Sequence, residues 1–211
     1  MKTFDQSKGR LFVISAPSGA GKTSLVNELV RRDPGLKFSI SYTTRRRRET
    51  EIEGKDYFFV EKDHFQDMVE QGEFLEHARV FGNYYGTGRS QVEGLLERGH
   101  NVILEIDWQG AQQVREAMPE CRSIFVLPPS RDELERRLKT RSTDSDEVIE
   151  RRLNDSVADM AHWQEFDYVV INDDFTSAAG ALADVVRGEG AEHSSGHPAL
   201  QEFAEKLLEK P

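Results

Sequence analysis

A short apolar run joined to a glycine-rich turn constrains the fold of this chain more than any other feature of its sequence. Residues 11–15, LFVIS, have the continuous apolar pattern of a strand buried in a parallel sheet. The turn APSGAGKT follows at residues 16–23, and a helix is predicted over about residues 21–31, before the residues DPG end it. Glycines let the backbone curl and the helix N-terminus adds positive potential, so this segment predicts a loop that binds nucleotide phosphates.

Two side chains of this loop suit a nucleoside triphosphate with magnesium. Lys22 can reach the β- and γ-phosphates, and the Thr23 hydroxyl can bind Mg2+. Ala16 stands where the common pattern has glycine, but alanine is small and this position need not adopt a positive φ. The residues expected to bind the triphosphate are Ala16, Pro17, Ser18, Gly19, Ala20, Gly21, Lys22, Thr23 and Ser24. Binding of ATP or GTP by such a loop does not by itself identify a reaction.

Three further segments have the pattern of core strands. They are residues 101–106 (NVILEI), 123–127 (SIFVL) and 168–171 (YVVI), each short and rich in β-branched residues. Helical patterns lie between them, for example at residues 61–71 and 91–98. This alternation predicts an α/β fold in which helices cover both faces of a parallel sheet.

Composition excludes several classes of protein. The chain has 211 residues, enough for one compact α/β unit with subdomains. Its net charge of −10 disfavours generic binding to nucleic acid, and it has no run of about 18 apolar residues that could span a membrane. The single cysteine, Cys121, fits a reducing cytoplasm. The histidines show no metal-ligand spacing, so no zinc site is expected.

Four consecutive arginines, residues 45–48, need an explanation in an acidic chain. Guanidinium groups bind phosphate through bidentate hydrogen bonds, although a solvated surface loop would look the same. The segments GKDY (54–57), EFLE (73–76) and GNYYGT (82–87) then add hydroxyls and carboxylates. A carboxylate can accept from guanine N1–H and N2–H together, and small hydroxyls can serve guanine O6. Together these segments predict a site for a phosphorylated purine.

Two acidic residues, Glu105 and Asp107, close the predicted strand 101–106. Residues two apart lie on the same side of an extended chain, and the carboxyl end of a parallel strand faces the ligand crevice. Such acids can hold a water bound to Mg2+ or face a substrate. A pair of solvated acids after a strand remains the alternative. Residues 131–165 are charged and helix-prone, and most of their arginines also fit solvated helices.

The ordered series of these segments resembles the guanylate kinase family. The matching stretches are SAPSGAGKTSL, FSISYTTRRRR, GKDYFFV, GEFLEHARVFGNYYGT, ILEIDWQGA, FVLPPS and VINDD, in family order across roughly residues 10–187. The resemblance implies a core phosphate-loop domain (1–40, 91–130 and 161–187), an inserted GMP-binding subdomain (41–90) and a helical lid (131–160). Residues 188–198 are interpreted as a flexible linker, and residues 188–211 as a linker with a C-terminal helical tail.

The resemblance also implies roles for individual residues. GMP phosphate would be held by Arg45, Arg48, Tyr57 and Tyr85, and guanine would be recognised by Ser41, Glu76, Thr87 and Asp107. Many family members carry serine where this chain has Thr87, and both offer a hydroxyl. Mg2+ would be bound by Thr23, with Glu105 acting through water, and Asn172 would lie near the adenine of ATP. The catalytic set would be Lys22, Arg45 and three lid residues, Arg137, Arg141 and Arg152.

The implied activity is transfer of the γ-phosphoryl group of ATP to GMP, and also to dGMP, with Mg2+. No general base is expected, because the phosphate of GMP is already anionic near neutral pH. Two other functions stay open: a non-catalytic binding module of the same fold, and a phosphate-loop kinase for another phosphorylated small molecule. Trp108 and Trp163 are interpreted as packing residues. The sequence does not determine the oligomeric state, and a homo-oligomer stays open.

Overall fold

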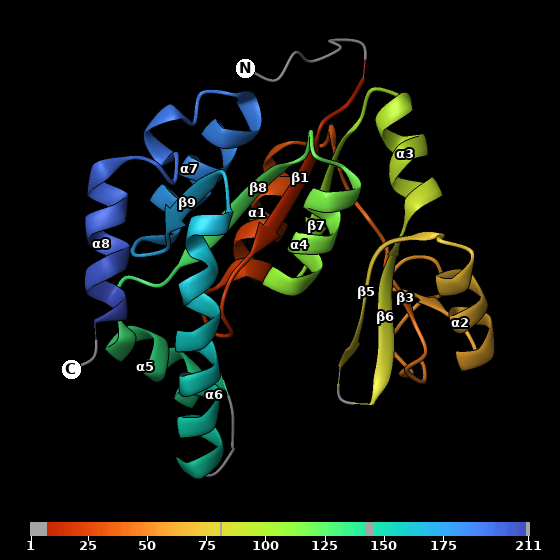
Figure 1. Ribbon diagram of the computed structural model, residues 1–211, viewed down its shortest axis with the longest axis horizontal. Helices are drawn as coiled ribbons and strands as arrows, with labels where there is room; N and C mark the ends of the chain where they lie inside the picture. The colour runs from red at the N-terminus through yellow and green to blue at the C-terminus, as the bar shows by residue number, and fades with distance from the viewer. Residues whose placement is uncertain (1–7, 81, 142–145, 210–211) are drawn as a thin grey trace. The chain divides into compact units, whose positions relative to one another are not determined.

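The computed structural model describes residues 8–80, 82–141 and 146–209, with the backbone alone for Arg141 and Asp146. The chain forms two compact units, which are treated separately (Figure 1). The first unit is built from Gly35–Leu104, Gln109–Cys121 and the residues up to Leu11. The second unit is built from Phe12–Pro34, Glu105–Trp108 and the residues from Arg122 onwards.

Three parallel strands form the centre of the second unit. They are β1 (Leu11–Ser15), β8 (Arg122–Leu127) and β9 (Tyr168–Ile171), with β8 between the other two. The pairs Ile14↔Ile124 and Val126↔Val170 fix the register, and these side chains are fully or almost fully buried. All of β1 is buried, as its unbroken apolar run requires of a central strand.

Helices pack around these strands. In α1, the buried residues Leu25, Val26 and Leu29 lie at the spacing of one helical face. Helix α1 contacts α7, α7 contacts β9, and α5 contacts α6. The helical segments of this unit are α1 (Lys22–Arg32), α5 (Arg131–Arg141), α6 (Asp146–Met160), η1 (Ala161–Glu165), α7 (Phe175–Arg187), η2 (Ala191–His193) and α8 (Pro198–Leu208).

The first unit contains a small mixed sheet in the order β4-β3-β6-β5. A stacked aromatic pair supports it: the rings of Phe65 and Phe74 lie 4.5 Å apart, with Met68 buried beside them. Because this core fixes the start of β5, it also fixes the residues that follow Phe74 along that strand. The segments are β3 (Tyr42–Thr43), β4 (Phe58–Phe59), α2 (Lys62–Glu70), β5 (Phe74–Val80), β6 (Asn83–Gly88), α3 (Arg89–Glu97) and most of α4 (Trp108–Ala117).

The first unit also contributes β2 (Leu36–Phe38) and β7 (Asn101–Glu105), which pair in parallel. The complete parallel sheet has the order β2-β7-β1-β8-β9. The predicted α/β class, with a parallel sheet and a separate inserted sheet, is therefore confirmed. The predicted strands agree with the observed ones to within one residue at each end. The division into core, GMP-binding subdomain and lid stays a prediction.

The segment after α7 differs from the flexible linker that the sequence indicates. Gly188 ends α7 at a φ of 91°, and η2 begins three residues later at Ala191. Ser194 forms a β-bridge with Tyr168, and the Ser195 N–H donates to the Asp167 carbonyl at 3.0 Å. The composition of this segment suggests a flexible backbone. The backbone at the start of β9, however, provides hydrogen-bond partners that order it.

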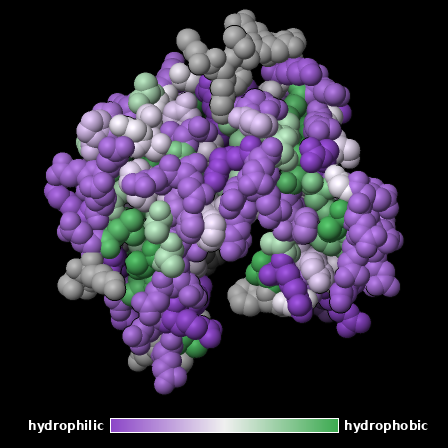
Figure 2. Space-filling model, viewed as in Figure 1, coloured by the Kyte–Doolittle hydropathy of each residue, from purple (hydrophilic) through white to green (hydrophobic). Residues whose placement is uncertain are grey.

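The tail helix α8 packs on its own unit. Ala204 and Leu207 are buried, and Arg131, the first residue of α5, donates from Nε to the Leu207 carbonyl at 2.7 Å. Figure 2 shows hydrophobic atoms between α8 and α5, where a shallow groove of about 360 Å³ includes Pro129 and Phe203. A cation at the C-terminus of a helix offsets the partial negative charge there, so Arg131 stabilises this end of α8. Among the described residues, no helix is long and apolar enough to cross a membrane.

The N-cap of α7 generates a prediction about stability and pH. The Asp174 carboxylate accepts from the Ser177 N–H at 2.8 Å, and this bond lowers the pKa of Asp174. Asp174→Ala is therefore expected to lower the Tm at pH 7. The contribution is present above the ordinary carboxyl pKa and disappears as the pH falls through the lowered value, so the Tm difference should shrink below about pH 4.

The measurement is thermal unfolding of both proteins from pH 7 to pH 3. Asp173→Ala, which removes the exposed neighbouring carboxylate, serves as the control and should leave the Tm unchanged. A Tm difference for Asp174→Ala that grows as the pH falls would contradict the capping role.

Candidate active site

The loop between β1 and α1 has a backbone that requires glycine at two positions. Gly19 has a φ of 89° and Gly21 a φ of 91°. A Cβ at Gly21 would lie 2.4 Å from the Asn172 amide nitrogen. That nitrogen donates to the Ala20 carbonyl at 2.7 Å, and Asn172 is buried at the end of β9. The strand end therefore holds the loop directly. A role for Asn172 beside adenine stays a prediction.

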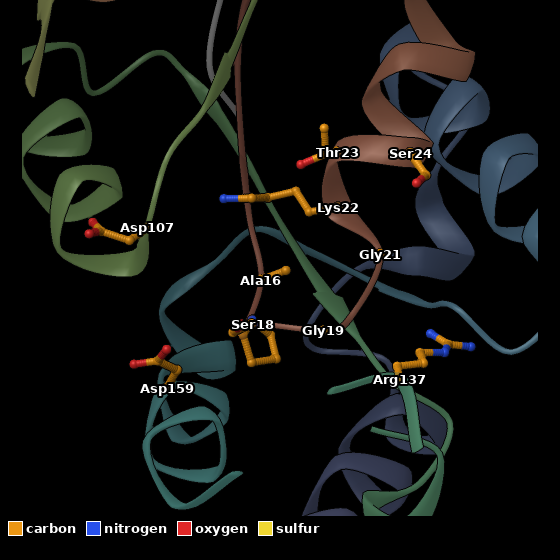
Figure 3. Close-up of a pocket in the computed structure, with 11 residues that line it drawn as sticks. Ala16, Ser18, Gly19, Gly21, Lys22, Thr23, Ser24, Asp107, Arg137 and Asp159 are labelled. Carbon is orange, nitrogen blue, oxygen red and sulfur yellow. The ribbon is translucent and has the colours of Figure 1, made fainter. Parts of the chain in front are cut away.

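Lys22, the first residue of α1, is surrounded by acceptors and acids. Its Nζ donates to the Ile106 carbonyl at 2.7 Å. Burial lowers the pKa of Lys22, whereas the nearby Glu105, Asp107 and Asp159 raise it. In Figure 3 the Lys22 side chain points to the side of the loop where Asp107 and Asp159 lie, and Arg137 lies on the other side. The ammonium is therefore held at the mouth of the loop, within a pocket that also contains the loop backbone.

Thr23 and Glu105 are brought together as a pair of oxygen ligands. The Thr23 hydroxyl donates to the Glu105 carboxylate at 2.5 Å, although the two residues are 82 positions apart in the chain. Hard cations such as Mg2+ prefer hydroxyl, carboxylate and water oxygens. The donor set at the start of α1 and the end of β7 therefore suits Mg2+, and the metal site itself stays a prediction.

Helices α5 and α6 place two predicted arginines on the loop. Arg137 donates to the carbonyls of Asn172 at 3.0 Å and Ala20 at 3.4 Å. Glu133 fixes its other edge through Nε at 2.7 Å. Arg152 on α6 reaches the Ser18 hydroxyl at 3.4 Å. Arg141 is the last residue of α5, and its side chain lies outside the described residues.

A cavity of about 610 Å³ lies over the loop. This volume suits a small-molecule ligand. Nearly all of the residues predicted to bind ATP line it, together with Asp107, Arg137 and Asp159. The predicted guanine residue Asp107 is thus at this pocket, in the second unit.

The first unit brings together two of the predicted guanine-binding residues. The Thr87 hydroxyl donates to the Glu76 carboxylate at 2.6 Å, with both residues almost fully buried. They face each other because β5 and β6 pair in register at Glu76↔Thr87. Burying a carboxylate is costly unless hydrogen bonds compensate it, so this pair indicates a built polar site. Ser41 lies just before β3 and is half-buried.

Arg45 stands at the centre of the other predicted cluster. Its guanidinium lies 5.4 Å from the centre of the Tyr57 ring, and the Tyr57 and Tyr85 rings lie 6.1 Å apart. Glu51 binds the same guanidinium with both carboxylate oxygens, at 2.6 and 3.1 Å. The bond to Glu51 raises the pKa of Arg45, burial opposes it, and Tyr85 adds to the rise. Arg45, Tyr57 and Tyr85 are thus one group.

The remaining arginines of the run differ in their surroundings. Arg46 and Arg47 are exposed, and Arg47 donates to the Glu51 carbonyl at 2.8 Å. The Arg48 side chain is also exposed, and its N–H donates to the Glu51 carboxylate at 2.8 Å. Glu51 therefore organises the loop that carries both predicted phosphate arginines.

Three residues of these sites were not found from the sequence. Glu51 has no pattern that separates it from the other acids near the arginine run. Ser156 donates to the Ser18 carbonyl at 3.2 Å, and Asp159 lines the phosphate pocket. Both follow Arg152 at the spacing of one helical face, and that spacing is the signal that could have identified them.

The strand–loop–helix geometry, with Lys22, Thr23 and Glu105 at its mouth, defines a phosphate-loop nucleotide-binding protein. The family model for guanylate kinase matches residues 8–189. The guanylate kinase of Alkalilimnicola ehrlichii is 54% identical over 200 residues, which cover 95% of this chain and 98% of that protein. The guanylate kinase of Escherichia coli K12 is 48% identical over 204 residues, 96% of this chain and 99% of that protein.

A solved structure agrees with these sequence matches. The crystal structure of guanylate kinase from Anaplasma phagocytophilum superposes with a TM-score of 0.69 at 34% identity, covering 97% of this chain and 98% of that one. The chain belongs to the guanylate kinase family.

Glu51 generates a prediction about GMP. Glu51→Gln removes the charge that orients the Arg45 guanidinium, so the phosphate of GMP would have to order this side chain itself. We expect the KM for GMP to rise about tenfold, with the KM for ATP within about twofold of the wild type. Steady-state kinetics with each substrate varied in turn measure both values.

Glu49→Gln is the matched control, because Glu49 is an exposed acid in the same loop. It should change neither KM. A lower KM for GMP in Glu51→Gln would mean that Glu51 competes with the phosphate instead of positioning Arg45.

Proposed function

We propose how the site carries out the guanylate kinase reaction, in which the γ-phosphoryl group of ATP passes to GMP to give ADP and GDP. The pocket over the phosphate loop takes ATP, and the cluster on the small mixed sheet takes GMP. The observation that carries the acceptor assignment is the buried hydrogen bond between Thr87 and Glu76, at 2.6 Å.

That pair suits guanine better than other bases. The Thr87 hydroxyl donates to the carboxylate and so fixes the orientation in which this acceptor group meets a base. Guanine offers N1–H and N2–H side by side, which adenine does not. The Ser41 hydroxyl, half-buried beside β3, can add a hydrogen bond to the base. A site built to bond these donors rejects bases that lack them, because its buried polar atoms are then left unpaired.

The phosphate of GMP is assigned to Arg45 and Arg48, with hydroxyl donors from Tyr57 and Tyr85. The orientation of Arg45 by Glu51 supports this role, since a guanidinium fixed in advance loses little entropy on binding phosphate. Asp107 is assigned to the guanine, and its place at the phosphate-loop pocket puts it near the transfer step.

The transfer step needs positive charge around the moving phosphoryl group. Its transition state spreads negative charge over the equatorial oxygens, and positioned cations stabilise that charge. Lys22, Arg137 and Arg152 lie on the phosphate loop, and Arg141 ends the same helix as Arg137. These four residues, with Arg45 on the acceptor side, form the proposed catalytic set.

Mg2+ would be held by the Thr23 hydroxyl, with Glu105 as a partner through water. When bound, the ion neutralises charge on the β- and γ-phosphates. The hydrogen bond between Thr23 and Glu105 also fixes the two side chains relative to each other. No residue is needed as a general base.

The remaining assignments rest on the sequence. We expect dGMP to be accepted as well as GMP, ATP to be the donor, and the location to be cytoplasmic. Asn172 is assigned to the adenine end of ATP, and a homo-oligomer stays open.

The experiment that tests this function is a coupled ADP-release assay with Mg-ATP. The acceptors are GMP, dGMP, AMP, UMP, CMP and ribose phosphate. Turnover with GMP, or with GMP and dGMP, and with none of the others is the expected result. Turnover with another acceptor instead would indicate a different phosphate-loop kinase. A folded protein that binds GMP and turns over nothing would indicate the non-catalytic binding module.

Glu76→Gln tests the guanine assignment. The variant keeps the shape of the side chain but turns N–H donors toward the donors of guanine. We expect kcat/KM for GMP to fall about 10- to 100-fold, because a hydrogen bond to a charged group contributes about 1.5–3 kcal/mol. Binding of ATP, measured by calorimetry, should stay within about twofold.

Thr87→Ser is the control, since it keeps the hydroxyl that donates to Glu76. It should retain wild-type kcat/KM within about threefold. Equal losses of GMP and ATP binding in Glu76→Gln would remove Glu76 from the guanine site.

A further inference from the structure

One face of α6 lies against the phosphate loop. Arg152 donates to the Ser18 hydroxyl at 3.4 Å, and the Ser156 hydroxyl donates to the Ser18 carbonyl at 3.2 Å. Asp159, three residues further, lines the pocket over the loop. These positions share one helical face, so the same side of α6 supplies all three contacts.

Asp159 is an unexpected group in a pocket for phosphates. A carboxylate in such a pocket repels phosphate groups unless a neighbouring group binds the carboxylate and compensates its negative charge. The Trp108 indole N–H donates to the Asp159 carboxylate at 3.0 Å. Burial raises the pKa of Asp159, and the bond from Trp108 lowers it. Asp159 also raises the pKa of Lys22, so the two charges compensate each other in part.

Trp108 is held from a second side as well. Its ring stacks on His162 in η1, with the ring centroids 3.4 Å apart and the planes at 10°. The His162 Nδ1 lies 2.5 Å from the Glu165 carboxylate. The indole is therefore fixed by the residues at and just after the end of α6, in both its position and its N–H direction.

The residues before Trp108 carry two groups of the active site. Asp107 lines the pocket, and the Ile106 carbonyl accepts from Lys22 at 2.7 Å. A bond that fixes Trp108 therefore fixes the segment 106–108. We propose that Asp159 is a positioning residue for phosphoryl transfer: it accepts from Trp108 and so fixes the Asp107 carboxylate and the carbonyl that holds Lys22.

This inference rests on the proposed role of Asp107 at the guanine. Two simpler roles compete with it. Asp159 could serve only to keep Lys22 charged, in which case the charge and not the hydrogen bond matters. The contact could also serve only stability, in which case the Tm changes while the kinetic constants do not. Substitutions at Asp159 and Trp108 separate these roles.

The test compares Trp108→Phe, Asp159→Asn and Asp159→Ala. Trp108→Phe removes the N–H but keeps a ring against His162, and Asp159→Asn removes the charge but keeps an oxygen that accepts. We expect Trp108→Phe and Asp159→Ala to raise the KM for GMP and to lower kcat, each about tenfold, with the KM for ATP within about twofold. Asp159→Asn should keep all three constants within about twofold. Asp155→Asn, an exposed acid on the same helix, is the control.

A spectroscopic readout accompanies the kinetics. The chain has two tryptophans, so two indole N–H resonances are expected in a 1H–15N spectrum, and Trp108→Phe identifies one of them. That resonance should shift in Asp159→Ala and shift less in Asp159→Asn. Thermal unfolding of each variant checks that it is folded at the assay temperature.

Four outcomes would overturn the inference. If Asp159→Asn is as impaired as Asp159→Ala while Trp108→Phe is normal, the charge on Lys22 is what matters. If the Tm falls while both KM values and kcat stay normal, the contact is only structural. Asp107→Asn, measured in parallel, tests the underlying proposal. A normal KM for GMP in Asp107→Asn removes Asp107 from the guanine and the inference with it, whereas an impaired Asp107→Asn beside a normal Trp108→Phe overturns the inference alone.

Discussion

A partly buried lysine, Lys22, lies at the centre of the phosphate-loop site in the second unit. Burial disfavours the charged form of Lys22, and the protein compensates with a carbonyl at 2.7 Å and three carboxylates, Glu105, Asp107 and Asp159. These acids come from the end of β7, the start of α4 and the end of α6. Groups from several distant segments of the chain therefore converge on one ammonium at the pocket over the phosphate loop.

The first unit also holds its charged side chains in fixed orientations through hydrogen-bond partners. Arg45 is paired with Glu51, and the buried Glu76 receives the Thr87 hydroxyl, so each group is oriented within its own sheet or loop. Orientation in advance matters because a ligand then loses less free energy in ordering the side chains that bind it. In both units, polar groups are thus held in place by neighbouring groups of the protein.

The sequence predicts the elements whose signal is local. The buried strand before the loop, the left-handed glycines and the β-branched strands each reflect the backbone conformation at that place, and the paired acids and hydroxyls follow from residue chemistry. Contacts between distant residues could not be predicted in this way. Trp108 was interpreted as a packing residue and does stack on His162, but its bond to Asp159, 51 positions away, leaves no trace in either segment. Glu51 is one acid among several, and the segment after α7 gains its order from the backbone near β9.

The contact between Gly21 and Asn172 changes what should count as the phosphate-loop motif in this chain. Any side chain at position 21 would meet the Asn172 amide at 2.4 Å, and that amide binds the carbonyl of Ala20 from 152 residues away. The eight residues of the loop are therefore only part of the structural unit that fixes its conformation. A substitution at position 172 removes a hydrogen bond to the loop while residues 16–23 stay unchanged, so variants at positions 21 and 172 should be interpreted together.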